Sequence, residues 1–289
     1  MKPSKFEFYQ PKTVEETLQL LEDMGEDAKI IAGGQSLVPI MNMRLATPKN
    51  LIDINRLVDL DFIENDETTL RIGTLTRQSR VEESSIVRKY AGLLSEAVPN
   101  IGHIQTRNRG TVGGSVVHAD PSAEIPLSLM ALNGAVKISS VDEERIVEAG
   151  DFFITYLTTD IMPTEMLTEV HIPIIGGRQG YAFTEFARKH GDFALVAAAC
   201  HLTIDDSDNI DTVRLVLGGV EAIPFLIEDA EEELKGEKIS DTLLDKIADI
   251  VADEVDPESD IHASADYRRH LAKILTKRTL QQAYNRARG

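Results

Sequence analysis

The sequence is short of residues on which several classes of protein depend. Among 289 residues it holds one cysteine, Cys200, and no tryptophan, and aromatic residues make up only 5%. A single cysteine excludes an intrachain disulfide framework, a four-cysteine zinc site and an iron–sulfur cluster held by this chain alone. Because Cys200 stands in the apolar stretch 193–204, we expect a buried, unreactive thiol. Redox chemistry in this chain would need a carrier other than cysteine.

Positive charge and long apolar segments are also scarce. Lys and Arg number 30 against 48 Asp and Glu, for a net charge of −18, and this negative field opposes binding to the phosphate backbone of nucleic acids. The longest uncharged run, residues 30–43, is interrupted by glycine and is too short to span a membrane, and the N-terminus lacks the apolar segment of a signal peptide. We therefore expect a cytoplasmic protein with no membrane span and no nucleic-acid partner.

Motifs for metal binding and for hydrolysis are missing too. Four histidines have neither HxxxH nor HxH spacing and do not stand beside a cysteine: His103, His118, His171 and His190. A zinc or iron site is therefore not expected. Neither serine next to the two glycine pairs of the chain forms a GxSxG elbow. We predict no catalytic side chain and no metal site.

Three regions with different patterns follow one another, over residues 1–55, 56–175 and 176–289. The first is typical of a small α/β unit, the second mixes short strands with helices, and the third holds three strands followed by helices. The fold class predicted is therefore α+β. The expected strands are 29–32, 51–54, 70–73, 135–138, 181–186, 195–204 and 213–220, and the expected helices are about 14–25, 81–98, 241–255 and 263–288.

Two local signals refine this outline. Thr13 followed by Glu16 is a capping box, which predicts where the first helix begins. The acidic segment 228–233 is interpreted as a solvated turn, and the basic final helix as a complement to its own C-terminal dipole. The alternative for both charged segments is a docking surface for a partner subunit.

The first candidate site is the segment Ala32–Leu37, where Gly33 and Gly34 follow directly on a strand. Glycines allow a tight turn and a close approach of the backbone, and consecutive N–H groups then form an anion-binding nest. Such a nest holds a diphosphate without a lysine. The alternative is an ordinary tight turn.

A second segment repeats this pattern downstream. In Arg107–Ser115 the pair Gly113 and Gly114 is flanked by the hydroxyls of Thr111 and Ser115. Two nests could hold the two phosphates of one dinucleotide from opposite sides. Neither segment matches GxGxxG or GxxxxGK[ST], so a Rossmann fingerprint and a P-loop are both unsupported.

Charged residues follow the second glycine pair. Asp120 is placed to accept hydrogen bonds from ribose hydroxyls, or to cap a helix that Pro121 opens and that has Glu124 in its first turn. The basic cluster Arg188–Phe193 could offset the negative charge of a reduced flavin or of phosphates, or form a surface turn capped by Asp192.

Six segments, in order, resemble the FAD-binding medium subunits of the molybdenum hydroxylases. This family includes aerobic carbon monoxide dehydrogenase, nicotinate and nicotine dehydrogenases, and the flavin domain of xanthine dehydrogenase. The segments are AGGQSLVPIMNMR (32–44), LIDINRL (51–57), IGTLT (72–76), TRNRGTVGGSVVHADPSAE (106–124), ARKHGDFALV (187–196) and ASADYRRHLAKIL (263–275). The resemblance extends over essentially the whole chain.

The resemblance implies a fold and a cofactor. The fold would be an FAD-binding fold of the vanillyl-alcohol-oxidase (PCMH) type, with subdomains 1–55 and 56–175, followed by a small α+β C-terminal domain over 176–289 with a three-stranded sheet and helices. FAD would lie non-covalently between the subdomains. The positions that match cofactor contacts of the family are Ile30, Ile31, Ala32, Gly33, Gly34, Gln35, Ser36, Leu37, Ile101, Thr111, Val112, Gly113, Gly114, Ser115, Glu124, Leu167 and Lys189, to which the spacing adds Asp120. Where relatives often carry a lysine, this chain has Thr184 and Glu185.

The function that the resemblance implies is electron transfer. Electrons from a large molybdopterin subunit would pass through [2Fe–2S] clusters of a small subunit to FAD in this chain, and then to an external acceptor. Molybdopterin and the clusters would reside only in the partners, and the assembly would be a dimer of heterotrimers. The alternatives are a stand-alone flavoprotein with Ser115 or His118 as its proton donor, and a non-catalytic assembly subunit without cofactor.

Overall fold

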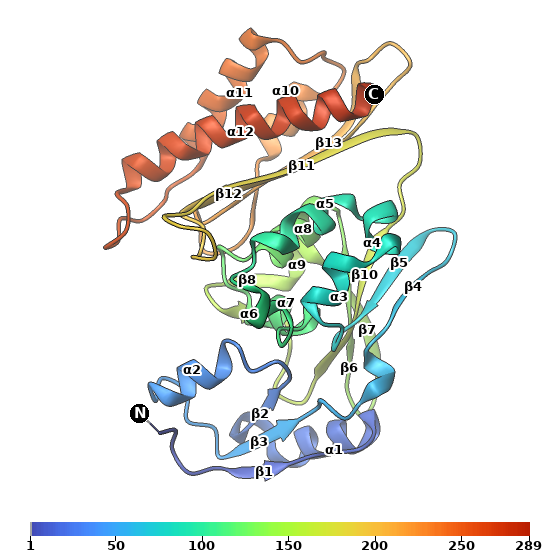
Figure 1. Ribbon diagram of the computed structural model, residues 1–289, viewed down its shortest axis with the longest axis vertical. Coiled ribbons are helices and arrows are strands. Elements are labelled where there is room, and N and C mark those ends of the chain that lie inside the picture. The colour runs from blue at the N-terminus through green and yellow to red at the C-terminus, as the bar shows by residue number, and fades with distance from the viewer. Residues whose placement is uncertain (1) are drawn as a thin grey trace.

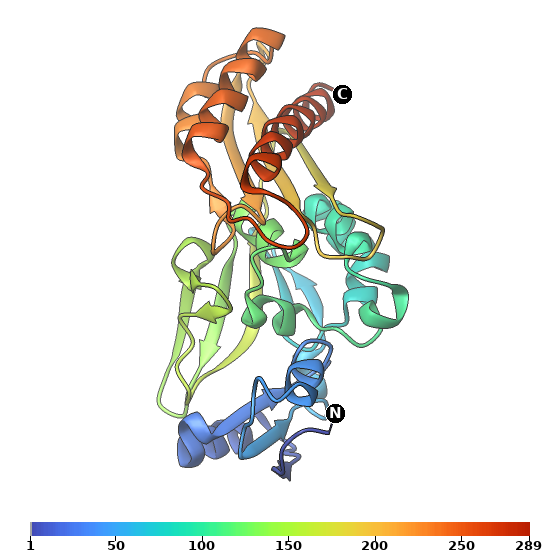
Figure 2. The same ribbon diagram turned by 90° about the vertical axis from the view of Figure 1, so that its left-hand side faces the viewer.

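The chain forms three parts stacked end to end, each built on its own sheet (Figures 1 and 2). The computed structural model describes residues 2–289. The N-terminal part lies at one end, the C-terminal part at the other, and a central part of helices and strands separates them. Of the described helices, none combines the length and the apolar character needed to cross a membrane.

The N-terminal part is a three-stranded parallel sheet. Its elements are β1 (Glu7–Tyr9), α1 (Val14–Met24), a 3-10 helix (Gly25–Asp27), β2 (Ala28–Ile31), α2 (Leu37–Asn42) and β3 (Asn50–Asp53). β3 lies in the centre and pairs in parallel with β1 and with β2. The predicted helix start is confirmed, because Thr13 is the N-cap of α1 and its Oγ1 accepts the Glu16 N–H at 3.1 Å. The reciprocal bond of a capping box is shifted by one residue, because Glu16 Oε2 accepts the Lys12 N–H at 2.7 Å. Since β2 and β3 are parallel, the segments that follow them leave the sheet at the same edge.

The central part is an antiparallel sheet in the order β4-β5-β10-β6-β7 with helices on one face. One sheet face packs Leu70, Ile72, Val136 and Ile138 into the core, and the helix α8 beside it is buried along its whole length. Its elements are a 3-10 helix (Val58–Leu60), β4 (Ile63–Asn65), β5 (Thr69–Gly73), α3 (Gln78–Glu83), α4 (Ser85–Tyr90), α5 (Gly92–Ala97), a 3-10 helix (Val98–Asn100), α6 (Ile104–Arg107), α7 (Val112–His118), α8 (Glu124–Ala131), β6 (Ala135–Ser139), β7 (Glu144–Glu148), α9 (Ala149–Phe152), the paired β8 (Phe153–Thr155) and β9 (Thr158–Thr159), and β10 (Met166–Pro173).

The C-terminal part is an antiparallel sheet in the order β11-β12-β13-β14, with α12 lying across it (Figure 1). Its elements are β11 (Arg178–Phe186), β12 (Val196–Ile204), β13 (Ile210–Gly218), β14 (Phe225–Leu226), α10 (Glu228–Leu234), α11 (Asp241–Glu254) and α12 (Ala265–Arg288). All nine residues of β12 are buried, because α12 covers one face of the sheet and the helices of the central part cover the other. The C-terminal sheet therefore shares a core with the central part.

Two predictions for the C-terminal part are wrong. The sheet has four strands rather than three, because the two-residue β14 pairs with β13; so short a strand has no alternation to reveal it. The acidic segment expected to be a solvated turn is the helix α10, which buries Ala230 and Leu234 against the sheet core. Three acidic residues occupy its first turn, where they stabilise the positive end of the helix dipole.

The basic residues of α12 pair with acidic residues of this chain. Lys273 contacts Asp249 at 2.6 Å, Lys277 contacts Asp245, and Arg286 reaches Glu96 of the central part at 2.6 Å. The charge of α12 is thus largely neutralised within the chain.

Cys200 lies on β12 and is fully buried in the core beneath α12. Burial raises the pKa of its thiol above the ordinary range. The thiolate is the reactive form of cysteine. We therefore expect a maleimide to label the chain completely when it is unfolded in guanidinium chloride, and to leave the native protein unlabelled over the same time. Mass spectrometry measures the labelling. Rapid labelling of the native protein would instead reveal local opening between α12 and the sheet.

Candidate functional site

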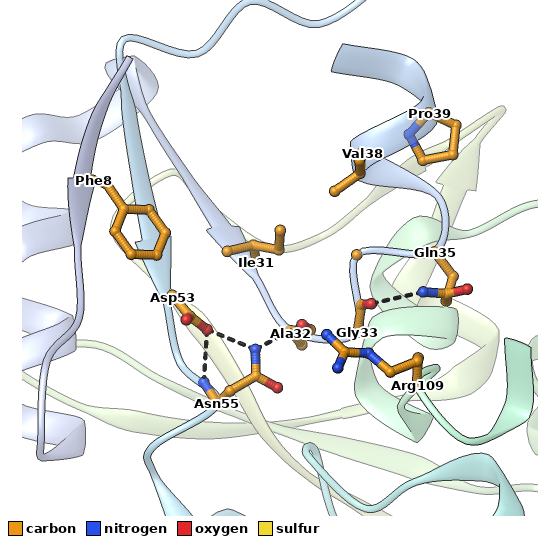
Figure 3. A pocket seen from close by; sticks show the side chains of 11 residues that line it. Phe8, Ile31, Ala32, Gly33, Gln35, Val38, Pro39, Asp53, Asn55 and Arg109 are labelled. Carbon is orange, nitrogen blue, oxygen red and sulfur yellow. Dashed lines mark hydrogen bonds between the residues drawn. The ribbon is translucent and has the colours of Figure 1, made fainter. Parts of the chain in front are cut away.

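A cavity of about 450 Å³ opens at the edge where β2 and β3 both end (Figure 3). Crevices at the carboxyl ends of parallel strands are common ligand sites, because several loops meet there. The lining residues come from β1, from the first glycine segment and the start of α2, from the end of β3, and from the segment before α7: Phe8, Ile31, Ala32, Gly33, Gly34, Gln35, Val38, Pro39, Asp53, Asn55 and Arg109.

The first glycine segment has free backbone donors beside this cavity. Within residues 2–289, the N–H groups of Gly33–Ser36 donate to no protein acceptor, and the carbonyl of Gly33 accepts from Gln35 Nε2 at 3.0 Å. Gly34 has φ +69°, a left-handed conformation that favours glycine. An anion-binding nest requires successive backbone N–H groups that have no acceptor in the protein and that surround a concave surface. The segment has the backbone that the sequence predicts for a nest.

The prediction of a second nest of exposed N–H groups is wrong. The last four residues of the second glycine segment form the start of α7, and their N–H groups are all used inside the protein: Val112 donates to the Thr76 carbonyl at 2.9 Å, Gly113 to the Thr74 carbonyl at 3.0 Å, Gly114 to Thr111 Oγ1 at 3.1 Å and Ser115 to the Thr111 carbonyl at 3.2 Å. A Cβ on Gly113 would lie 1.7 Å from Thr74 Oγ1. This glycine therefore serves close packing of α7 against the segment after β5.

The two glycine segments meet through their backbones. A Cβ on Gly33 would lie 2.3 Å from the Arg109 carbonyl oxygen and 2.9 Å from Gly110 Cα. Since backbone atoms cannot rotate away as a side chain can, only glycine permits this contact. The tertiary structure thus brings residues 33 and 109 into direct contact, although the second segment contributes no N–H donors.

Polar residues at the end of β3 and just after it also line the cavity, and sequence reasoning missed them. Asn55 Nδ2 donates to the Ala32 carbonyl at 2.8 Å and to Asp53 Oδ1 at 2.6 Å. Burial raises the pKa of Asp53, but hydrogen bonds from Gln10 and Asn55 outweigh it and leave that pKa below its usual value, so a carboxylate lines the cavity. The position of Asp53 and Asn55 directly after a strand parallel to β2 was the available signal.

Of the predicted cofactor residues, Ile31 and Ala32–Gln35 line this cavity and the others do not. Three of the others lie in separate parts of the fold. Leu167 is 2% exposed in the central core, and Ile101 packs partly buried against the same core. The Lys189 side chain is 73% exposed and lies 3.7 Å from Asp192. The structure does not bring these side chains together with the first glycine segment.

The predicted roles of Asp120 and Pro121 in opening a helix are wrong. α8 begins at Glu124, with Ala123 as its N-cap and no side-chain cap. Asp120 Oδ1 instead accepts the Ser122 N–H at 2.9 Å, which closes a turn before the helix. The physical reason is that this turn packs on the C-terminal sheet, where the Gly219 N–H donates to the Pro121 carbonyl at 3.0 Å.

Two carboxyl groups, one buried and one half-buried, lie where the central and C-terminal parts join. Glu124 at the start of α8 is 7% exposed, and burial, with the nearby charges of Glu185 and Asp120, raises its pKa to about 8. Burial raises the pKa of Glu185 on β11 to about 7, and Glu185 Oε2 has no partner among the described residues. The neighbouring Thr184 faces the other way and contacts Thr279 of α12.

Family models match most of the chain. Residues 4–175 match the FAD binding domain in molybdopterin dehydrogenase, and residues 181–283 match the CO dehydrogenase flavoprotein C-terminal domain. The residues between these ranges, 176–180, contain the start of β11.

Individual relatives extend over the full length. The chain is 38% identical to the 6-hydroxypseudooxynicotine dehydrogenase complex subunit alpha of Paenarthrobacter nicotinovorans, over 100% of this chain and 97% of that one. It matches a chain of carbon monoxide dehydrogenase from Hydrogenophaga pseudoflava with TM-score 0.96 and 33% identity, over 99% of each chain. It matches a chain of quinoline 2-oxidoreductase from Pseudomonas putida 86 with TM-score 0.94 and 35% identity, over 99% of each.

These matches agree with the six segments that the sequence shares with one family, and with its predicted α+β class and FAD-binding domain. The relatives are subunits of molybdenum-dependent dehydrogenases. The chain belongs to the family of FAD-binding medium subunits of the molybdenum hydroxylases, and is an oxidoreductase subunit.

Proposed function

We propose that this chain carries FAD between the iron–sulfur clusters of a small subunit and an external electron acceptor, in a cytoplasmic molybdenum hydroxylase of three different subunits. The large subunit would hold molybdopterin, and the whole would pair into a dimer of heterotrimers. Relatives that match over their whole length are named as a complex subunit and as medium chains of dehydrogenases, which supports a place in an assembly.

One observation carries this proposal: the free N–H groups of Gly33–Ser36 beside the cavity at the end of β2. FAD has a diphosphate, which such a nest is suited to bind. A Cβ at Gly33 would collide with the Arg109 carbonyl oxygen, so this position of the glycine segment must remain glycine. These residues fit the cofactor that the family model describes.

The remaining contacts follow from the geometry and the resemblance. The first segment, Ile30–Leu37, would hold the diphosphate. The second segment would contribute the hydroxyl of Ser115 and the exposed surface of Gly114 rather than N–H groups, and Thr111, which is buried, would hold Gly114 in position through its hydroxyl. Asp120, Glu124, Ile101, Leu167 and Lys189 would complete the site by binding or packing around the rest of the cofactor.

The role of the protein is to bind and tune the cofactor. FAD, when bound, accepts electrons one at a time and releases them in pairs. The side chains described here orient the cofactor, keep Asp53 and the nest in place, and exclude water from the core behind them. No side chain of this chain need act as acid or base on the primary substrate, which would react at the large subunit.

The absorption spectrum of the purified chain tests the proposal. We expect a two-banded flavin spectrum that bleaches on reduction with dithionite, and release of FAD into the supernatant on denaturation, identified by chromatography. A colourless chain that takes up no added FAD would contradict the flavin site and favour a non-catalytic assembly subunit. Steady turnover of a carbon substrate by the isolated chain would favour a stand-alone flavoprotein instead.

A further inference from the structure

Arg109 brings an unpaired positive charge to the cavity. Its side chain lines the wall together with Gly33, Gly34 and Gln35 (Figure 3). Among the described residues, its guanidinium has no hydrogen-bond acceptor and no ion pair, and only its carbonyl oxygen is engaged, by Arg77. In a chain with a net charge of −18, a free cation beside four free N–H groups makes a local positive site.

Arg77 holds the backbone of Arg109 in place through hydrogen bonds. Arg77 Nη1 donates to the Arg109 carbonyl at 2.6 Å, and Arg77 Nη2 donates to Asn55 Oδ1 at 2.7 Å. Asn55 in turn donates to the Ala32 carbonyl at 2.8 Å. A continuous chain of hydrogen bonds therefore runs from the residue before the nest to Arg109, and it fixes their separation.

The charges around the cavity favour an anionic ligand at this point. Burial and the nearby charge of Arg109 lower the pKa of Arg77, and together they outweigh the opposing charges of Asp61 and Asp53. The carboxylate in the wall, Asp53, already accepts hydrogen bonds from Gln10 and Asn55. Of the two guanidinium groups, only that of Arg109 has no acceptor among the described residues, because Arg77 is engaged by Asn55 and by the Arg109 carbonyl. The Arg109 guanidinium is therefore the group that is free to bind an anionic ligand.

We propose that Arg109 is a further cofactor-binding residue, whose guanidinium binds the diphosphate of FAD together with the N–H groups of Gly33–Ser36, and that Arg77 and Asn55 are positioning residues for it. A guanidinium presents paired donors that match two phosphate oxygens. The inference rests on the proposed function, since it assigns residues to the same FAD site.

Titration of the full chain, stripped of FAD, with FAD at a series of salt concentrations tests this assignment. Arg109→Gln is expected to bind FAD about 10- to 100-fold more weakly than wild type, the range for loss of a hydrogen bond to a charged group. The salt dependence of its dissociation constant should also be smaller, because one screened charge contact is gone. Arg278→Gln is the matched control, because Arg278 is an exposed arginine of α12, in the C-terminal part, and does not line the cavity; it should bind as wild type.

Arg77→Lys separates positioning from direct contact. It keeps the charge but cannot make both hydrogen bonds, so we expect weaker FAD binding. Because Arg77 acts through Arg109, Arg77→Lys should weaken binding much less when it is added to Arg109→Gln than when it is introduced into wild type. Fully additive losses in the double variant would make Arg77 itself a ligand and overturn its positioning role. Wild-type affinity in Arg109→Gln, with the unfolding temperature unchanged, would overturn the inference and leave the proposed function standing. A wild-type chain that binds no FAD would overturn both.

Discussion

The Gly33→Ala protein is expected to be purified without FAD and to fail to take it up. The added Cβ would lie 2.3 Å from the Arg109 carbonyl oxygen and 2.9 Å from Gly110 Cα, so the two segments must separate. Separation displaces the nest, the Arg109 side chain and the hydrogen bond from Asn55 to Ala32 together. We also expect the free energy of unfolding of the FAD-free chain to fall by about 1–3 kcal/mol, the usual cost of overpacking.

Gly150→Ala is the matched control for this substitution. A Cβ at Gly150 meets nothing within 4 Å, and its position in α9 suits alanine. It should retain FAD and unfold as wild type. Absorption at the flavin bands measures cofactor content, and urea unfolding followed by circular dichroism measures stability. Full flavin content in Gly33→Ala would contradict the placement of the diphosphate at the first glycine segment.

The wild-type chain is expected to lose stability between pH 5 and pH 8, and Glu124→Gln is expected to remove most of that loss. Burial raises the pKa of Glu124 from the ordinary 4.5 to about 8. The folded chain therefore holds a proton that the unfolded chain releases above pH 4.5. The contribution of the neutral carboxyl group to the free energy of unfolding is therefore complete below pH 4.5. It is lost as the pH rises to about 8, by about 5 kcal/mol in total.

Glutamine has the shape of the neutral carboxyl and does not ionise, so Glu124→Gln should be more stable than wild type at pH 8 and nearly equal to it at pH 5. Glu185, whose pKa is raised to about 7, adds a smaller loss in the same direction. Glu67→Gln, at an exposed position, is the control and should follow wild type. Urea unfolding at four pH values measures the effect. An identical pH slope in Glu124→Gln and wild type would show that Glu124 is ionised in the folded chain.

Local signals were sufficient for most elements. The capping box at Thr13 marks the start of α1, and the apolar stretch around Cys200 marks the buried strand β12. The glycine turn after β2 and the shared segments identified the family and its cofactor. In each case the deciding interactions lie within a few residues of one another, where composition and spacing are informative.

Tertiary structure alone decided how the site is assembled. Arg77 reaches Asn55 and Arg109, which stand 22 and 32 residues away, and no local pattern encodes these contacts. The second glycine pair resembles the first in sequence, but its N–H groups are not free. Gly113 donates to the Thr74 carbonyl, and Gly114 donates to Thr111 Oγ1. Glu124 and the half-buried Glu185 lie close enough to influence each other's charge only because α8 packs against the C-terminal sheet.

By itself, the sequence determined the class of fold, the redox cofactor and the glycine turn after β2, since these depend on residue types and short spacings. The structure decided which backbone donors remain free, which arginine lacks a partner and which carboxyl groups lose their water. The physical reason is that hydrogen-bond satisfaction and desolvation are properties of what surrounds a group in space, and the surroundings come from distant parts of the chain.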